Sequence, residues 1–340
     1  MVEQVEPSEV SCWRADSLGG VDAVTRHVDV DEITEQARAL AAAGVTYDTL
    51  NLDDLPLGDL TDVFADIDLE LRERSGIVIV DGFPVDDPQV AELVLWRVAA
   101  VIGSPVSQSV MGERLGHVIN MTDIDPHARA YRRNDELTPH TDPADVLTFL
   151  CLNPAVEGGE SWFVSAMTLY RILRDEHPEL LERHERGWRY HRFGEQPDDH
   201  PPITPHRVPT FSTCDSVLSA RYVRQYIEIA HDEDPDGCPL DDIDRQALDT
   251  LDRYGRDPNL ALHFTLQAGQ AVFANNYTVF HARTGFTDPP GHPKRHLIRL
   301  WLDAHKTRPV TPNTRIYPGS PGIDPQPGRQ PSYVTNTTII

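Results

Sequence analysis

The chain is poor in cysteine, which excludes a fold stabilised mainly by disulfide bonds. Its 340 residues include four cysteines, Cys12, Cys151, Cys214 and Cys238, and none lies in a C-x-x-C pair. This density is far below that of a disulfide scaffold, so we expect reduced thiols and a cytoplasmic protein. The first six residues are acidic and lack the basic and then apolar layout of a signal peptide.

Long apolar runs and positive charge are also scarce. No apolar run approaches the roughly 18 residues that a membrane-spanning helix needs. The 30 lysines and arginines are outnumbered by 54 aspartates and glutamates, which gives a formal net charge of −24. Such a charge repels nucleic acids and anionic membranes, so we expect neither as a partner and instead a small-molecule substrate. These properties leave the oligomeric state undetermined.

The hydrophobic pattern predicts a mainly β protein with flanking helices. Strands do not alternate regularly with helices, which argues against a parallel doubly wound sheet. Short strands are expected at residues 76–81, 116–120, 145–152, 161–164, 263–266, 271–273, 278–281 and 296–302, with a hairpin at 208–218. Helices are expected at residues 31–43, 60–74, 87–102, 165–186 with a break at Pro178, 219–229 and 241–254. We predict one domain over residues 1–340, a jelly-roll sandwich with an irregular segment at 1–30 and an extended tail at 306–340.

Two histidines and an aspartate form the most informative pattern. His140 and Asp142 make an H-x-D triplet, and His281 ends the run Thr278-Val-Phe-His281. Residues i and i+2 of an extended segment face the same way, so His140 and Asp142 can bind one face of an ion. Neutral imidazoles with an ionised carboxylate are the ligand set of an Fe(II) site with open coordination positions. We therefore predict a ferrous centre held by these three side chains.

Two arginines follow the second histidine. Arg295 lies fourteen residues after His281, where such iron sites place a guanidinium for the far carboxylate of 2-oxoglutarate. A guanidinium suits this task because it holds a carboxylate through two parallel hydrogen bonds. Arg299, four residues on, shares a strand face with Arg295. It is either a second inward cation that holds a substrate carboxylate or one half of a surface ion pair.

These residues and their surroundings resemble those of a known family. The similar stretches are residues 137–142, 151–152, 158–161, 219–227, 269, 275–276, 281–284 and 295–302. They span about residues 75–310, most of the chain. Together they resemble the TauD/TfdA-like branch of the Fe(II)/2-oxoglutarate-dependent dioxygenases, with kinship to clavaminate synthase-like and γ-butyrobetaine hydroxylase-like enzymes.

The resemblance implies a fold and roles for individual residues. It implies an oxygenase core at 75–310 built as a double-stranded β-helix of the cupin-like type, with iron on His140, Asp142 and His281. It also implies 2-oxoglutarate on the iron, its far carboxylate on Arg295, and a hydrogen bond from Ser161, where the family usually has threonine. Related halogenases replace the carboxylate of the triplet by a small residue, so Asp142 disfavours halogenation.

Three residues are candidates for binding the substrate. Arg299 is the first, for the reason given above. Asn275 can aim its amide into a pocket, although turn formation explains an asparagine there nearly as well. Arg221 lies in a predicted helix and is either a substrate-binding cation or a solvated one.

The sequence therefore predicts an Fe(II)/2-oxoglutarate-dependent oxygenase. With O2, it would oxidise an unactivated C–H bond of a small, amino-acid-like or carboxylate-bearing substrate and release succinate and CO2. Hydroxylation is the expected outcome, and desaturation or cyclisation are the other possible ones. Two alternatives remain open: a zinc-dependent hydrolase with the same three ligands, which has no need of Arg295, and a non-catalytic β-barrel binding module.

Overall fold

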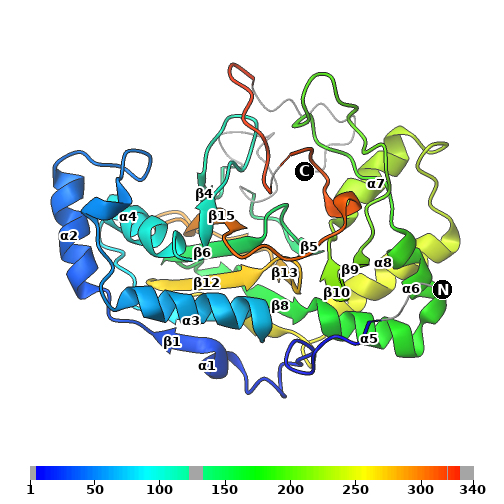
Figure 1. The fold of residues 1–340 in the computed structure, drawn as a ribbon, viewed down its shortest axis with the longest axis horizontal. Helices are drawn as coiled ribbons and strands as arrows, with labels where there is room; N and C mark the ends of the chain where they lie inside the picture. Colours follow the sequence, from blue (N-terminus) through cyan, green and yellow to red (C-terminus); the bar gives the residue numbers. More distant parts are fainter. Residues whose placement is uncertain (1–4, 122–132, 320, 330–340) are drawn as a thin grey trace.

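Two β-sheets pack face to face in the computed structural model, which describes residues 5–121, 133–319 and 321–329 (Figure 1). The larger sheet has the strand order β1-β2-β12-β6-β15-β3, and β4 also pairs with β15. Its strands are β1 Thr25–His27, β2 Ile77–Asp81, β3 Gly103–Pro105, β4 Leu115–Ile119, β6 Val146–Asn153, β12 Gln270–Asn275 and β15 His296–Ala304. The smaller sheet is antiparallel, with the order β11-β8-β13-β5. Its strands are β5 Leu137–His140, β8 Ser161–Ser165, β11 Leu262–Phe264 and β13 Val279–Arg283.

The space between the two sheets is filled by apolar side chains from both. Ile77 and Val272 enter it from the larger sheet, and Phe163 and Val279 from the smaller one. Because successive residues of a strand point to opposite faces, each strand that contributes here also presents side chains to a helical layer. In β15, for example, Leu297 lies in this inner core, whereas Ile298 packs in the core shared with the helices.

Helices cover the outer surfaces of the sandwich in two groups (Figure 1). The group α2 Asp31–Ala42, α3 Leu60–Glu73 and α4 Pro88–Ala99 packs on the outer face of the larger sheet. The group α5 Ala166–Glu176, α6 Pro178–Arg186, α7 Arg224–Glu233 and α8 Asp242–Gly255 lies at the opposite end. The sequence signals for α4 operate as expected: Pro88 opens the helix, and the Asp87 carboxylate accepts a hydrogen bond from the Gln89 backbone N–H at 2.9 Å.

Two sequence predictions for local structure are wrong. The segment 1–30, predicted to be irregular, contains α1 Val21–Val24 and β1, which pairs in parallel with β2. The residues of β1, Thr-Arg-His, do not alternate between apolar and polar, so the sequence alone gives no sign of this strand. It forms because it pairs with β2. The predicted helix 219–229 begins later, as α7 at Arg224. Ser219 and Ala220 instead pair with β9 Phe211–Cys214 as part of β10 Val217–Ala220, which uses their backbone hydrogen bonds.

The remaining elements are short, and the C-terminal segment has an extended course. The strands β7 Glu157–Gly158 and β14 Phe286–Thr287 pair with each other, and η1 Leu52–Asp54 and η3 Pro312–Thr314 are single 3₁₀ turns. Beyond η3, Gly322 N–H donates to the Pro143 carbonyl and Ile323 N–H to the Ser107 carbonyl. The segment therefore lies against the two loops that follow β5 and β3.

The structure bears on two further expectations, which concern disulfide bonds and membrane-spanning helices. All four cysteines are free, as expected. No helix in the described ranges combines the length and apolar character that crossing a bilayer requires.

We predict that Gly187→Ala destabilises the fold far more than Gly44→Ala, although both glycines have positive φ angles. Gly187 ends α6 with φ +71°, and an added Cβ would lie 2.3 Å from the Val208 carbonyl oxygen. Gly44 has φ +83° but no atom within 4 Å of such a Cβ. Urea unfolding should show a loss of about 1–2 kcal/mol for Gly44→Ala and roughly 2–5 kcal/mol for Gly187→Ala. Equal losses would contradict the assigned contact.

Candidate metal centre and its pocket

Strand pairing brings the predicted ligands together. β5 and β13 are antiparallel neighbours in which His140 and His281 are direct partners, and Asp142 lies two residues past the end of β5. The two imidazole ring centres are 4.1 Å apart, and His281 Nε2 is 3.8 Å from Asp142 Oδ2. Each of the three residues offers one ligand atom, and these atoms all lie within 4.8 Å of one another. The arrangement can hold one ion.

The alternation of side chains along β13 decides which of them face the cavity. Val279 packs between the sheets, whereas Phe280 packs toward the helices. His281, two residues after Val279, therefore faces the inner space, and so does Arg283. The ring of His281 lies near those of Phe149 and Phe163, which close the cavity around it.

The protonation states suit a divalent metal. Burial, with the neighbouring His140 ring, lowers the pKa of His281 to about 3, and burial also lowers the pKa of His140. Burial opposes ionisation of Asp142, but the charge of Arg299 holds the pKa of this carboxyl below its usual value. The site thus presents two neutral imidazoles and a carboxylate, the donor set that Fe(II) takes.

The tautomer of His140 is fixed by its neighbour. Its Nδ1 lies 2.7 Å from the Thr138 carbonyl oxygen, which can only accept a hydrogen bond. Nδ1 must therefore carry the proton, which leaves Nε2 as the ligand atom. Hydrogen bonds of this kind orient metal-binding histidines and raise their basicity.

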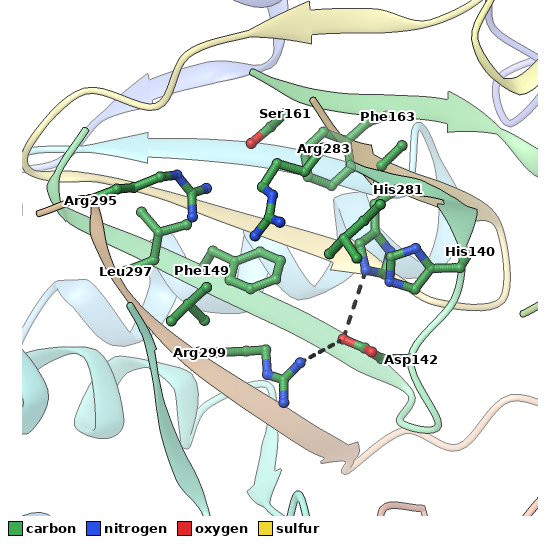
Figure 2. Close-up of a pocket in the computed structure, with 13 residues that line it drawn as sticks. His140, Asp142, Phe149, Ser161, Phe163, His281, Arg283, Arg295, Leu297 and Arg299 are labelled. Atoms are coloured by element: carbon green, nitrogen blue, oxygen red, sulfur yellow. Dashed lines mark ion pairs between the residues drawn. The ribbon is translucent and has the colours of Figure 1, made fainter. Parts of the chain in front are cut away.

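The three residues line one cavity (Figure 2). Three arginines also reach into it, Arg283 from β13, Arg299 from β15, and Arg295 just before β15. The apolar part of the wall consists of Val118, Leu137, Phe149, Phe163, Ala282 and Leu297, and Ser161 completes the lining. Figure 2 shows Arg295 farthest from the two histidines, Arg283 next to Phe149 between them, and Arg299 beside Asp142.

Arg295 is buried, and part of its guanidinium is left without a hydrogen bond by the residues described. It is 4% exposed, its Nη1 has no hydrogen-bond partner in the described part of the chain, and burial lowers its pKa to about 10. Burial and the charge of Arg295 lower the pKa of Arg283 to about 9. Arg283 Nη2 donates to the carbonyls of Arg133 and Asp135, but its Nε is unpartnered among the same described residues. An anion between the two guanidiniums would satisfy both, so this end of the cavity fits a carboxylate.

Arg299 lies at the metal end. Its Nε donates to Gln108 Oε1 at 2.7 Å, and its Nη1 is 3.8 Å from Asp142 Oδ2. With 4% of its surface exposed it is no surface ion pair, which excludes one of its two interpretations from the sequence. Its charge faces both the carboxylate ligand and the cavity.

The other predicted residues divide into two groups. Ser161 lines the cavity opposite Arg283 in the register of β8 and β13. Asn275 and Arg221 do not line it. The amide of Asn275 donates to the Leu71 carbonyl and accepts from the Tyr277 N–H, so it forms a turn. Arg221 donates to the carbonyl of Asp142, so it supports the ligand loop from behind.

Some pocket residues escaped the sequence analysis although a signal existed. Arg283 lies two residues after His281 on the same strand, so it must share its face. Asn276 does not line the pocket, but it supports the site, because its Oδ1 accepts a hydrogen bond from the Asp142 N–H at 3.2 Å. Phe149 and Phe163 lie in predicted strands, but no pattern in the sequence says which strand faces will meet.

Comparison with known proteins identifies the family. The model of the "Taurine catabolism dioxygenase TauD, TfdA family" matches residues 35–301. The chain belongs to this family. FR-33289 synthase of Streptomyces rubellomurinus is 28% identical over 289 residues, which cover 82% of this chain and 83% of that protein.

Solved structures agree with the predicted fold of this TauD/TfdA-family chain. Asparagine oxygenase in complex with Fe(II), 3-hydroxyasparagine and succinate has a TM-score of 0.64 at 15% identity, covering 82% of this chain and 93% of that one. OrfP, a non-haem iron oxygenase solved with Fe and α-ketoglutaric acid, has a TM-score of 0.60 at 15% identity, covering 82% and 94%. The predicted jelly-roll, cupin-like fold is confirmed.

Family membership decides the class of chemistry. The protein is a 2-oxoglutarate-dependent dioxygenase that uses Fe(II), 2-oxoglutarate and O2, as predicted. The zinc hydrolase and the binding module are therefore set aside. The cavity agrees, because it combines a suitable donor set with buried guanidiniums that can hold an anion.

We predict that metal binding is nearly independent of pH between 8.5 and 7.0. Both histidines have pKa values below the ordinary 6.5, so above that lowered range they carry no proton for the metal to displace. Anaerobic titration with Co(II), a redox-stable substitute for Fe(II), should show affinity changing less than about threefold per pH unit. A roughly tenfold loss per unit within this range would mean that a ligand histidine is protonated there, against the lowered pKa values.

Proposed function

We propose that this enzyme hydroxylates an unactivated C–H bond of a small, amino-acid-like or carboxylate-bearing substrate. One observation carries the proposal: the three candidate ligands share a cavity with a buried guanidinium, Arg295, whose Nη1 is unpartnered among the residues described. Bound together, Fe(II), 2-oxoglutarate and O2 supply the oxidising chemistry, in which 2-oxoglutarate gives succinate and CO2 and the substrate gains one oxygen.

The protein residues would divide the binding work. His140, Asp142 and His281 would hold Fe(II) on one side and leave the opposite positions open. Arg295 would hold the far carboxylate of 2-oxoglutarate, with Ser161 as a further hydrogen-bond donor and Arg283 adding positive charge at the same end. Phe149, Phe163 and Leu297 would keep water out of the space between the metal and this carboxylate.

Arg299 supports the substrate class. It lies at the metal end of the cavity, away from Arg295, and its guanidinium is buried beside the Asp142 carboxylate (Figure 2). A buried cation there favours a substrate with an anionic group, such as an amino acid or one of its derivatives. The fold shared with asparagine oxygenase and OrfP supports the same class.

Two further expectations belong to the proposal. The enzyme would act as a single catalytic domain over residues 1–340. It would work in the cytoplasm, for which the four free cysteines are the support.

We predict that Arg295→Gln raises the apparent KM for 2-oxoglutarate by at least about 30-fold, since the roughly 2–5 kcal/mol associated with a broken buried charge pair is lost. Gly159→Ala should cause a smaller rise, because its Cβ would lie 3.1 Å from Arg295 Nε at φ +70°. Arg38→Gln, at the exposed pair with Asp86, is the matched control and should match wild type. An unchanged KM in Arg295→Gln would remove this residue from the role.

The substrate class is tested by screening amino acids and small carboxylic acids for stimulated succinate release, followed by the mass of the product. A gain of one oxygen supports hydroxylation, and a loss of two hydrogens indicates desaturation or cyclisation.

We predict that Arg299→Gln raises the KM for the active compound at least tenfold while the KM for 2-oxoglutarate changes little. Asp142→Ala should release no succinate above background. Activity restricted to uncharged compounds would overturn the assignment.

A further inference from the structure

One oxygen of the candidate ligand Asp142 is held by an indole. Trp301 Nε1 donates a hydrogen bond to Asp142 Oδ2 at 2.8 Å. The same oxygen lies 3.8 Å from His281 Nε2 and 3.8 Å from Arg299 Nη1. Trp301 lies on β15 two residues after Arg299, so the two side chains share a face of the strand, and both are buried.

Trp301 also contacts the arginine. The Arg299 guanidinium carbon lies 4.6 Å from the centre of the Trp301 ring system. The edge of one indole thus binds the carboxylate, and its face lies under the guanidinium. Gln108 holds the guanidinium from another side through Arg299 Nε.

This arrangement restrains a carboxylate and a guanidinium that attract each other. In a buried site, opposite charges 3.8 Å apart would gain by closing to direct hydrogen-bond distance. A closed pair would turn Asp142 Oδ2 away from the histidines and would occupy the N–H groups of Arg299. A neutral N–H donor fixes the oxygen without adding charge, so both groups keep their orientation toward the cavity.

We propose that Trp301 is a positioning residue that keeps Asp142 oriented toward the metal and holds the Arg299 guanidinium in its place at the metal end of the cavity. The inference rests on the proposed function, in which Asp142 is a ligand and Arg299 binds an anion. It adds a residue that touches neither the substrate nor the metal and acts through the two that do.

Trp301→Phe removes the N–H donor and keeps a ring face for Arg299, and the loss of ring volume is matched by a control. Anaerobic titration with Co(II) should show an affinity about 10–100-fold below wild type, the usual cost of losing a hydrogen-bond partner of a metal ligand. The KM for the substrate should rise as well, whereas the KM for 2-oxoglutarate, held at the Arg295 end, should stay within about twofold.

Trp188→Phe is the matched control. Trp188 is equally buried, and its indole N–H has no partner among the residues described, so the same exchange removes no hydrogen bond. It should bind Co(II) as wild type does. If Trp301→Phe also matches wild type, the inference is overturned. Trp301→His, which keeps a ring N–H at similar reach, should recover most of the affinity, and it serves as the test if the phenylalanine variant does not fold.

A double-mutant cycle separates restraint from general disruption. If Trp301 works by preventing closure of Asp142 on Arg299, Trp301→Phe should cost less Co(II) affinity in an Arg299→Gln background than in wild type. If Trp301→Phe costs as much Co(II) affinity in the Arg299→Gln background as in wild type, or more, the proposed restraint is overturned. Asp142→Ala tests the underlying function independently: if that variant keeps full Co(II) affinity, the ligand assignment itself fails, whatever Trp301 does.

Discussion

The pairing of β5 with β13 is the constraint on which the site depends. It places His140 directly opposite His281, although 140 residues of chain lie between them. A slip of one residue would send one imidazole into the helical layer, because alternate residues of a strand face opposite ways. The register is held by the same alternation, since Val279 must stay between the sheets and Phe280 must stay against the helices.

The cavity reverses the electrostatic character of the whole chain. A protein with a net charge of −24 places three guanidiniums in one buried space, two of them with lowered pKa values. Their desolvation opposes folding, and nearby carbonyls offset part of that cost. An anionic cosubstrate would offset much of the rest. Binding and stability are therefore linked here, and occupancy of the cavity should stabilise the fold.

The sequence was most informative where residue type and spacing carry chemistry. His140, Asp142, His281 and Arg295 could be selected because few residue types bind iron or a carboxylate, and the cavity contains all four. Asn275 and Arg221 do not line the cavity, because the direction of a side chain at the end of a strand depends on which backbone groups lie nearby. Trp301 was overlooked because an apolar strand residue resembles core, and its indole N–H acquires a role only when β15 passes beside the loop after β5.

The course of the C-terminal segment has a practical consequence. Gly322 and Ile323 are hydrogen-bonded to the loops that contain Pro143 and Ser107, which adjoin Asp142 and Gln108. The segment around Gly322 and Ile323 thus acts as a strap across the back of the ferrous site. Substitutions that break these two backbone hydrogen bonds would therefore loosen the loops of Asp142 and Gln108 while leaving the pairing of the sheets intact.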